Sequence, residues 1–264
     1  MRHDWDRRAR ENARHYIATA NEQWNEEEYY NSGRLNVFHE VLTDLGNVCK
    51  QKNARAMKIL EIGCGTGRMT RAFSEVFGDV YAVDISGEMI ERGRQALAGI
   101  PNVHMFQNSG ADLRVLGDVQ VDFAFSYIVF QHIPSREVIY NYVREVYRVL
   151  RPGALFKFQV QGADLRHEPG ADTWQGVYFT EEEAFELARQ TGFELRYRHG
   201  AGEQYFWLWF FKPEAPGLEP PPSRKDAPGR AGASTATKVG SFIGRGLRNV
   251  LGRARAPIAP TRAR

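Results

Sequence analysis

Three glycines with an acidic residue just before them form the part of this sequence whose spacing best indicates chemistry. Gly63, Gly65 and Gly67 follow an apolar run at residues 59–62, and a helical pattern begins directly after them. A strand, a glycine turn and a helix in this order form the unit that binds nucleotide-like cofactors at the carboxyl edge of a parallel sheet. Glycine suits such a turn because only a residue without Cβ readily takes a positive φ and lets a ligand touch the backbone.

The spacing of these glycines and two nearby carboxylates narrows the choice of cofactor. The pattern is G-x-G-x-G, whereas the usual dinucleotide fingerprint is G-x-G-x-x-G. Glu61 lies two residues before Gly63, where its negative charge would repel a pyrophosphate. S-adenosylmethionine carries an ammonium and a sulfonium and has no phosphate, so it tolerates this carboxylate. Asp84 ends the next apolar run, 21 residues after Gly63, about the separation expected of a carboxylate that accepts hydrogen bonds from ribose hydroxyls.

At these residues the chain resembles the class I S-adenosylmethionine-dependent methyltransferases, over roughly residues 57–211. Residues 60–67 (Leu-Glu-Ile-Gly-Cys-Gly-Thr-Gly) are similar to the family's first motif, and residues 83–86 (Val-Asp-Ile-Ser), followed by Met89, are similar to its second. The resemblance implies that the two motifs hold the methionine part and the ribose of S-adenosylmethionine. It assigns these motif residues to cofactor binding: Glu61, Gly63, Cys64, Gly65, Gly67, Asp84, Ile85 and Met89.

The loop after the third expected strand cradles the adenine in this family. In the family, a carboxylate or amide in this loop often accepts a hydrogen bond from the adenine amine. When this sequence is aligned with the family, Ser109 occupies that position and Gly110 follows it. Leu113 would press on the adenine face. Because serine departs from the family pattern, the contact is left open between Asn108, Ser109 and Asp112.

Residues 126–134 resemble the family segment that lines the site of methyl transfer. Tyr127 either touches the cofactor or belongs to the core. His132 is a candidate general base because imidazole titrates near the working pH, and the alternative is a structural histidine that closes the loop. The segment lacks the Asn/Asp-Pro-Pro-aromatic motif found in many enzymes that methylate amino nitrogens of nucleic acids, which argues against those substrates. It also lacks a cysteine, which argues against covalent attack on a pyrimidine ring. Methyl transfer from a sulfonium needs no metal. The spacing of the Cys and His residues matches no zinc site, so no metal is expected in this protein.

Two aromatic residues are candidates for contact with the acceptor. Tyr30 lies in the N-terminal helical region, where it either closes over the cofactor edge or only packs this region on the sheet. Trp174 lies in the long connection at residues 159–179, where it either stacks on a sugar or aromatic acceptor or anchors the loop.

The elements that would position these residues alternate between strands and helices. Strands are expected at residues 57–62, 79–83, 103–107, 121–127, 154–160, 193–199 and 204–211, and helices at residues 67–77, 86–98, 135–150 and 180–191. Thr180 and Glu183 are expected to form a capping box at the start of the last of these helices, and the segment Arg151-Pro152-Gly153 is expected to end a helix. The alternation predicts an α/β fold, a Rossmann-like, mostly parallel sheet with helices on both faces. A short turn at residues 200–202 forces the last two strands into an antiparallel hairpin. The family resemblance implies seven strands in the order 3-2-1-4-5-7-6, with the last strand antiparallel.

Three regions of different composition are expected. Residues 1–55 form an N-terminal helical cap, residues 56–213 the methyltransferase domain, and residues 214–264 a disordered tail rich in Pro, Gly and Ala. The tail holds ten Lys and Arg and three acidic residues, which gives it a net charge of +7. Because the net charge of the whole chain is +3, residues 1–213 carry a net charge of −4. Residues 238–253 form a weak basic amphipathic helix, which would contact an anionic membrane or a partner protein, or be idle.

Composition places the protein in the cytoplasm, with peripheral membrane contact through the tail as an added possibility. No apolar run reaches the ~18 residues that a membrane span needs. The first residues are charged in both signs and do not read as a signal peptide, and two cysteines cannot form a disulfide framework.

We therefore expect a methyltransferase that moves a methyl group from S-adenosylmethionine to an oxygen or nitrogen of a small molecule or glycan. No basic stripe with interleaved aromatics marks the catalytic domain, which argues against nucleic acid. The alternatives are a protein methyltransferase and a catalytically silent scaffold that binds the cofactor and a partner.

Overall fold

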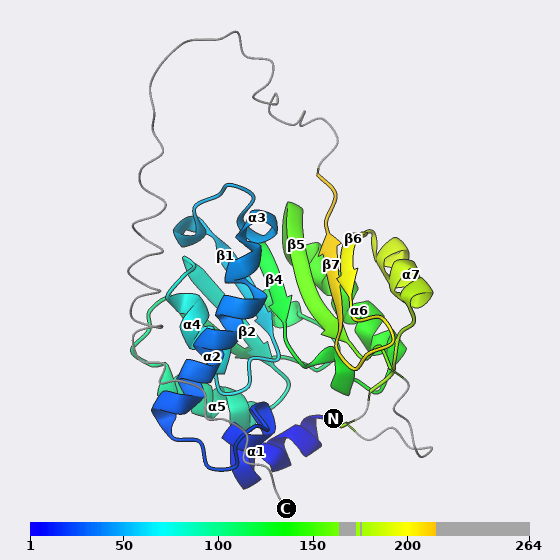
Figure 1. Cartoon of the computed structure of the whole chain (residues 1–264). Coiled ribbons are helices and arrows are strands. Elements are labelled where there is room, and N and C mark those ends of the chain that lie inside the picture. Colours follow the sequence, from blue (N-terminus) through cyan, green and yellow to red (C-terminus); the bar gives the residue numbers. More distant parts are fainter. Residues whose placement is uncertain (164–172, 175, 215–264) are drawn as a thin grey trace, which may run out of the picture. The chain divides into compact units, whose positions relative to one another are not determined.

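The computed structural model describes residues 1–163, 173–174 and 176–214, and its centre is a seven-stranded sheet covered by helices on both faces (Figure 1). The strands run in the order β3-β2-β1-β4-β5-β7-β6, as the resemblance implied. Their bounds are β1 Lys58–Ile62, β2 Asp79–Asp84, β3 Val103–Gln107, β4 Val121–Ser126, β5 Leu150–Val160, β6 Glu194–His199 and β7 Phe206–Phe211. The strands from β3 to β5 pair in parallel. The aromatic strand β7 lies between β5 and β6 and is antiparallel to both, and its apolar residues fit a strand buried on both faces of the sheet.

Seven α-helices accompany the sheet in the described part of the chain. They are α1 Arg2–Ile17, α2 Glu26–Glu40, α3 Leu45–Cys49, α4 Arg68–Ser74, α5 Gly87–Ala96, α6 Arg136–Val149 and α7 Glu181–Thr191. The side chains of Ser86, Ser135 and Thr180 accept the first backbone N–H groups of α5, α6 and α7. Thr180 and Glu183 also form the reciprocal capping box that the sequence indicated. The sequence positions of these caps explain where the three helices begin.

Two layers of apolar side chains fill the space between sheet and helices. One face of the sheet packs on α6 and α7, and the opposite face packs on α2, α3 and α4 (Figure 1). Gly33 lets α2 approach α4 closely, since a Cβ there would lie 2.1 Å from the carbonyl oxygen of Arg68. This contact sets the N-terminal region directly against the helix that follows the glycine loop.

The segment at residues 151–153 differs from the expectation. Helix α6 already ends at Val149, and β5 begins at Leu150, so Pro152 and Gly153 lie within the strand. The pairing of β4 with β5 shifts register near its start, and Gly153 has φ +75°. Proline and glycine therefore mark an irregular strand entry here, which is one of the few strand positions that accept a residue without an N–H.

The N-terminal region reaches the carboxyl edge of the sheet through α1, which lies beside α5 (Figure 1). Helix α1 is broken at Asn12, whose backbone is extended (φ −163°, ψ 83°). No described helix is both long and apolar enough to cross a bilayer. The basic helix expected at residues 238–253, and with it the predicted membrane or partner contact, lies outside the described residues.

Candidate functional site

The glycine loop takes a backbone path that only glycine allows. Gly63, Gly65 and Gly67 have φ values of +76°, +55° and +86°. A Cβ on Gly63 would lie 2.2 Å from a methyl carbon of Val129, in the loop after β4. The loop is fixed to β2 because the N–H groups of Gly63 and Cys64 donate to the carbonyl of Val83 at 2.7 and 3.1 Å. The motif therefore forms a rigid turn at the junction of β1, β2 and β4.

Asp84 holds its carboxylate at the end of β2 through two backbone donors. The N–H of Gly65 donates to Oδ2 at 2.9 Å, and the N–H of Ser86 donates to Oδ1 at 2.9 Å. Burial raises the pKa of Asp84, and these hydrogen bonds to the charged form offset part of that increase. The carboxylate is thereby locked against the glycine loop.

Glu61 is the more deeply buried of the two carboxyl groups, with 5% of its surface exposed. The hydroxyl of Thr70 donates to it at 2.6 Å. Burial raises its pKa to about 8, so most of the population is protonated at neutral pH. A cation that entered beside Glu61 would favour the ionised form and lower this pKa again.

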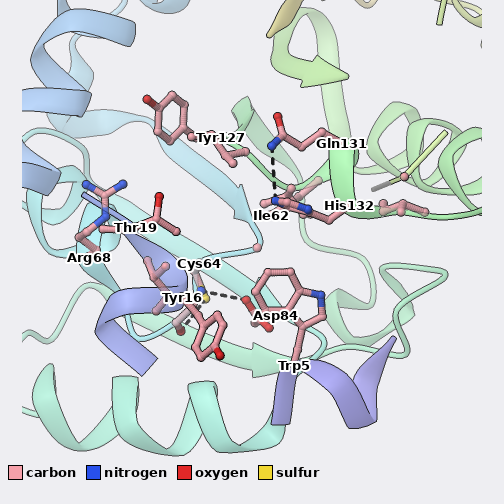
Figure 2. Close-up of a pocket in the computed structure, with 18 of the residues that line it drawn as sticks. Trp5, Tyr16, Thr19, Ile62, Cys64, Arg68, Asp84, Tyr127, Gln131 and His132 are labelled. Atoms are coloured by element: carbon pink, nitrogen blue, oxygen red, sulfur yellow. Dashed lines mark hydrogen bonds between the residues drawn. The ribbon is translucent and has the colours of Figure 1, made fainter. Parts of the chain in front are cut away.

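A cavity of about 500 Å³ opens beside these carboxyl groups (Figure 2). Ten of the residues proposed from the sequence line it, namely Glu61, Gly63, Cys64, Gly65, Asp84, Ile85, Met89, Tyr127, His132 and Trp174. Residues 60–67 and 83–89 thus meet the loop after β4 around one space, although they are far apart in the chain. This convergence is the arrangement that the sequence motifs implied.

Five of the proposed residues do not line this cavity. They are Gly67, Ser109, Gly110, Leu113 and Tyr30. Gly67 is the N-cap of α4, Gly110 packs under Ile85, and Leu113 is fully buried in the core. Tyr30 is buried beneath the guanidinium of Arg71, 4.5 Å from its ring centroid. The structure therefore places Tyr30 in the packing of the cap rather than on the cavity wall.

Asn108, rather than Ser109, faces the cavity from the loop after β3. The hydroxyl of Ser109 turns back and accepts the N–H groups of Ala111 and Asp112 at 3.1 and 3.0 Å. The amide of Asn108 donates to the hydroxyl of Tyr142 at 2.9 Å, and its Oδ1 is buried without a partner among the described residues. Of the three alternatives left open by the sequence, Asn108 is the one that lines the cavity.

His132 has a defined tautomer because of its contact with Trp174. Its Nδ1 lies 2.8 Å from the carbonyl oxygen of Trp174, which can only accept a hydrogen bond. Nδ1 therefore carries the proton, and in the neutral ring Nε2 is the acceptor nitrogen. The amide nitrogen of Gln131 lies 3.4 Å from Nε2 (Figure 2). The ring is 8% exposed and also meets the edge of Trp5 at 5.5 Å.

The loop that carries His132 is strained at Ile128. This β-branched residue has φ +56°, a value that strongly favours glycine or asparagine. Its N–H donates to Oε1 of Gln159 on β5 at 2.8 Å, and Gln159 is buried. The pair has no signal in the sequence, because its partners lie 31 residues apart, one in the loop after β4 and the other on β5. Residues held in strained backbone regions cluster at functional sites.

Helix α1 covers part of the cavity and is fastened there by Arg8. The guanidinium lies between two indole rings, 4.7 Å from the centroid of Trp5 and 5.1 Å from that of Trp174. It also donates to the hydroxyl of Thr173 at 3.1 Å. Trp5, Tyr16 and Trp174 all line the cavity. Sequence reasoning missed Trp5 and Arg8, although their spacing of three residues on one helix could have indicated a shared face.

Comparison with known proteins identifies the kind of domain that carries this site. Residues 59–153 match the family model described as a methyltransferase domain. A malonyl-[acyl-carrier protein] O-methyltransferase from Serratia marcescens is 32% identical over 120 residues, which cover 46% of this chain and 44% of the relative. A probable S-adenosylmethionine-dependent methyltransferase from Mycolicibacterium smegmatis is 31% identical over 152 residues, covering 54% and 56%. The chain thus spans about half the length of the curated relatives it matches.

A solved structure supports the same fold. A SAM-dependent methyltransferase from Aquifex aeolicus superposes with a TM-score of 0.51 at 19% sequence identity, and the match covers 72% of this chain and 100% of that one. At this identity the likeness shows the fold alone.

Proposed function

We propose that this chain, whose residues 59–153 form a class I S-adenosylmethionine-dependent methyltransferase domain, transfers a methyl group to an oxygen or nitrogen of a small molecule or glycan. One observation carries the proposal. The glycine loop, Asp84 and His132 surround a single cavity of about 500 Å³, so a cofactor site and a candidate base share one space. The Serratia relative is an O-methyltransferase, which is consistent with an oxygen acceptor.

The residues on the cavity wall fit S-adenosylmethionine. Asp84 presents a fixed carboxylate suited to ribose hydroxyls, and the unpartnered Oδ1 of Asn108 suits the adenine amine. A Cβ on Gly63 would collide with the side chain of Val129, and one on Gly65 with that of Ile17, so the turn keeps its path beside the cavity only with glycine at both positions. Glu61 faces the cavity with a raised pKa, which an ammonium group would lower. We infer that these groups, with Cys64, Ile85, Met89 and Tyr127 beside them, form the cofactor site.

S-adenosylmethionine supplies a methyl group already activated by its sulfonium, so the chain mainly has to align the acceptor, exclude water and move a proton. His132 is placed for the last task. Its Nδ1–H is held by the carbonyl of Trp174, and Nε2 would accept the proton that the acceptor hydroxyl or ammonium loses. Helix α1, fastened by Arg8, would keep water from this part of the cavity.

Aromatic side chains favour a small acceptor with apolar or ring surface. Trp5, Tyr16, Trp174, Tyr178 and Tyr205 line the cavity, and all of these rings can stack on a sugar or an aromatic group. A cavity of about 500 Å³ admits such an acceptor more readily than a folded protein. Trp174 is thus proposed to contact the acceptor.

The test joins cofactor titration with turnover of a panel of hydroxylated, amino and glycan acceptors. Wild-type protein should bind S-adenosylmethionine, and Asp84→Ala should lose this binding. His132→Ala should lower turnover by roughly 10²- to 10⁴-fold while cofactor affinity stays within about threefold. Turnover that survives His132→Ala would remove the base assignment. Tight cofactor binding without methylation of any acceptor would favour the scaffold instead.

A further inference from the structure

Arg68 is a buried cation on the cavity wall that forms no ion pair with any Asp or Glu of the described residues. It is the first residue of α4, directly after the glycine loop, and is 6% exposed. Its Nη1 donates to the hydroxyl of Ser32 at 3.1 Å and to Oδ1 of Asn36 at 2.6 Å. Both of these partners are neutral. Its Nε is buried without any partner among the described residues.

A guanidinium in this position needs an anion. Arginine stays charged in proteins, and a buried charge that lacks a counter-ion is strongly unfavourable. Burial lowers the pKa of Arg68, which reflects this uncompensated environment. Tyr29, Tyr127 and, least of the three, Glu61 oppose this lowering of the pKa, and most Glu61 side chains are protonated at neutral pH. The charge of Arg68 is therefore left for a ligand to balance.

The orientation of the guanidinium is fixed by α2. Because Ser32 and Asn36 hold Nη1 and Nε is buried, Nη2 is the guanidinium nitrogen left to donate to a carboxylate in the cavity. Gly33 lies between these two residues and permits the close approach of α2 to α4. The N-terminal region thus shapes a subsite of the cavity.

The surroundings identify which carboxylate would bind. Arg68 and Glu61 flank the glycine loop, line the same cavity and interact electrostatically. Figure 2 shows Arg68 at one side of the cavity and His132 with Trp5 at the other, so the cation is remote from the proposed base. An acidic and a basic group side by side match the two charges of an α-amino acid.

We propose that Arg68 binds the α-carboxylate of S-adenosylmethionine while Glu61 faces its ammonium, so that α2 orients the methionine end of the cofactor through Ser32 and Asn36. This inference rests on the proposed function. It assigns Arg68 a binding role and Ser32 and Asn36 a positioning role, and it makes the N-terminal region part of the cofactor site.

The experiment compares two ligands that differ only beyond the sulfur. S-adenosylhomocysteine keeps the amino-acid end, whereas 5′-methylthioadenosine keeps the adenosine and sulfur but lacks the carboxylate and ammonium. Calorimetric titration of Arg68→Met should show S-adenosylhomocysteine weakened by roughly 10- to 100-fold, the value of a charge-assisted hydrogen bond. Affinity for 5′-methylthioadenosine should change by less than about threefold. Arg68→Lys, which keeps the charge without the guanidinium, should fall between Arg68→Met and wild type.

Arg71→Met provides a matched control on the same helix. Arg71 contacts Tyr30 and Glu26 and does not line the cavity, so both ligands should bind it as they bind wild type. Equal weakening of both ligands by Arg68→Met would mean that Arg68 only supports the fold. If Arg68→Met bound S-adenosylhomocysteine as tightly as wild type does, Arg68 would be assigned to an anionic acceptor instead. That result would overturn this inference and leave the proposed function standing. A folded wild-type protein that bound neither ligand would instead refute the proposed function, and this inference with it.

Discussion

Replacing Glu61 by glutamine should stabilise the cofactor-free protein by an amount that grows with pH. Glu61 is 5% exposed, and burial raises its pKa from 4.5 to about 8. The folded protein therefore holds a proton that the unfolded chain releases above pH 4.5. The pKa of Glu61 is higher in the folded protein than in the unfolded chain. The stability that depends on protonated Glu61 is therefore fully present below pH 4.5 and is lost as the pH rises to about 8.

The size of the effect follows from the two pKa values. Each unit of difference corresponds to about 1.4 kcal/mol, so keeping Glu61 buried costs about 1 kcal/mol at pH 5 and about 4 kcal/mol at pH 8. Glutamine is neutral at both pH values, and its Oε1 can still accept from the hydroxyl of Thr70. Glu61→Gln should therefore unfold at higher urea concentration than wild type, with the larger gain at pH 8.

Urea unfolding of both proteins at pH 5, 6, 7 and 8, without cofactor, measures this difference. Glu91→Gln serves as the control, because Glu91 is exposed on α5 and contacts only Gln95 among the hydrogen-bonded side chains described. Its stability should stay within about 0.5 kcal/mol of wild type at every pH. A gain for Glu61→Gln that did not change with pH, or a loss at pH 8, would show that the buried carboxyl is ionised and would refute the reasoning. The same variant should bind S-adenosylhomocysteine more weakly, since it cannot ionise beside an ammonium.

Three further substitutions test the glycine turn and two contacts that support the cavity. Gly63→Ala should abolish cofactor binding and destabilise the fold by about 2 kcal/mol or more, as seen by titration and urea unfolding, because its Cβ would lie 2.2 Å from Val129 at a positive φ. Gln159→Leu should lower the unfolding free energy by about 1–3 kcal/mol in urea unfolding, because it leaves the N–H of Ile128 without an acceptor. Arg8→Ala should speed dissociation of S-adenosylhomocysteine in stopped-flow measurements by loosening α1, and an unchanged rate would show that α1 does not retain the ligand.

The sequence predicted the sheet and its order well because these depend on local patterns and on the family resemblance. Thr180 and Glu183 form the expected capping box, and the short turn before β7 produced the expected hairpin. The prediction failed at Pro152 and Gly153, where a helix end was expected and an irregular strand entry is found. Proline and glycine break a regular pattern in either case, so their types alone do not distinguish the two.

The site was only partly predictable for a related reason. Residues tied to the two motifs reached the cavity, because the carboxyl ends of parallel strands meet at one edge. In the loop after β3, the side chain that faces inward is Asn108 and not Ser109, and this depends on how the loop turns. Tyr30 also packs in the cap, away from the cavity, because its ring is covered by Arg71.

By itself, the sequence determined the glycine turn, the carboxylates at the ends of β1 and β2, and therefore the class of cofactor, since these are set by residue type and spacing within about 25 residues. Only the tertiary structure decided that Arg68 is buried without a counter-ion, that α2 orients it, and that Arg8 lies between two indoles to hold α1 over the cavity. The physical reason is that burial and charge pairing arise from groups distant in the chain: Arg8 and Thr173 are 165 residues apart. Such contacts leave no periodic signal in the sequence, yet they set the electrostatics of the site.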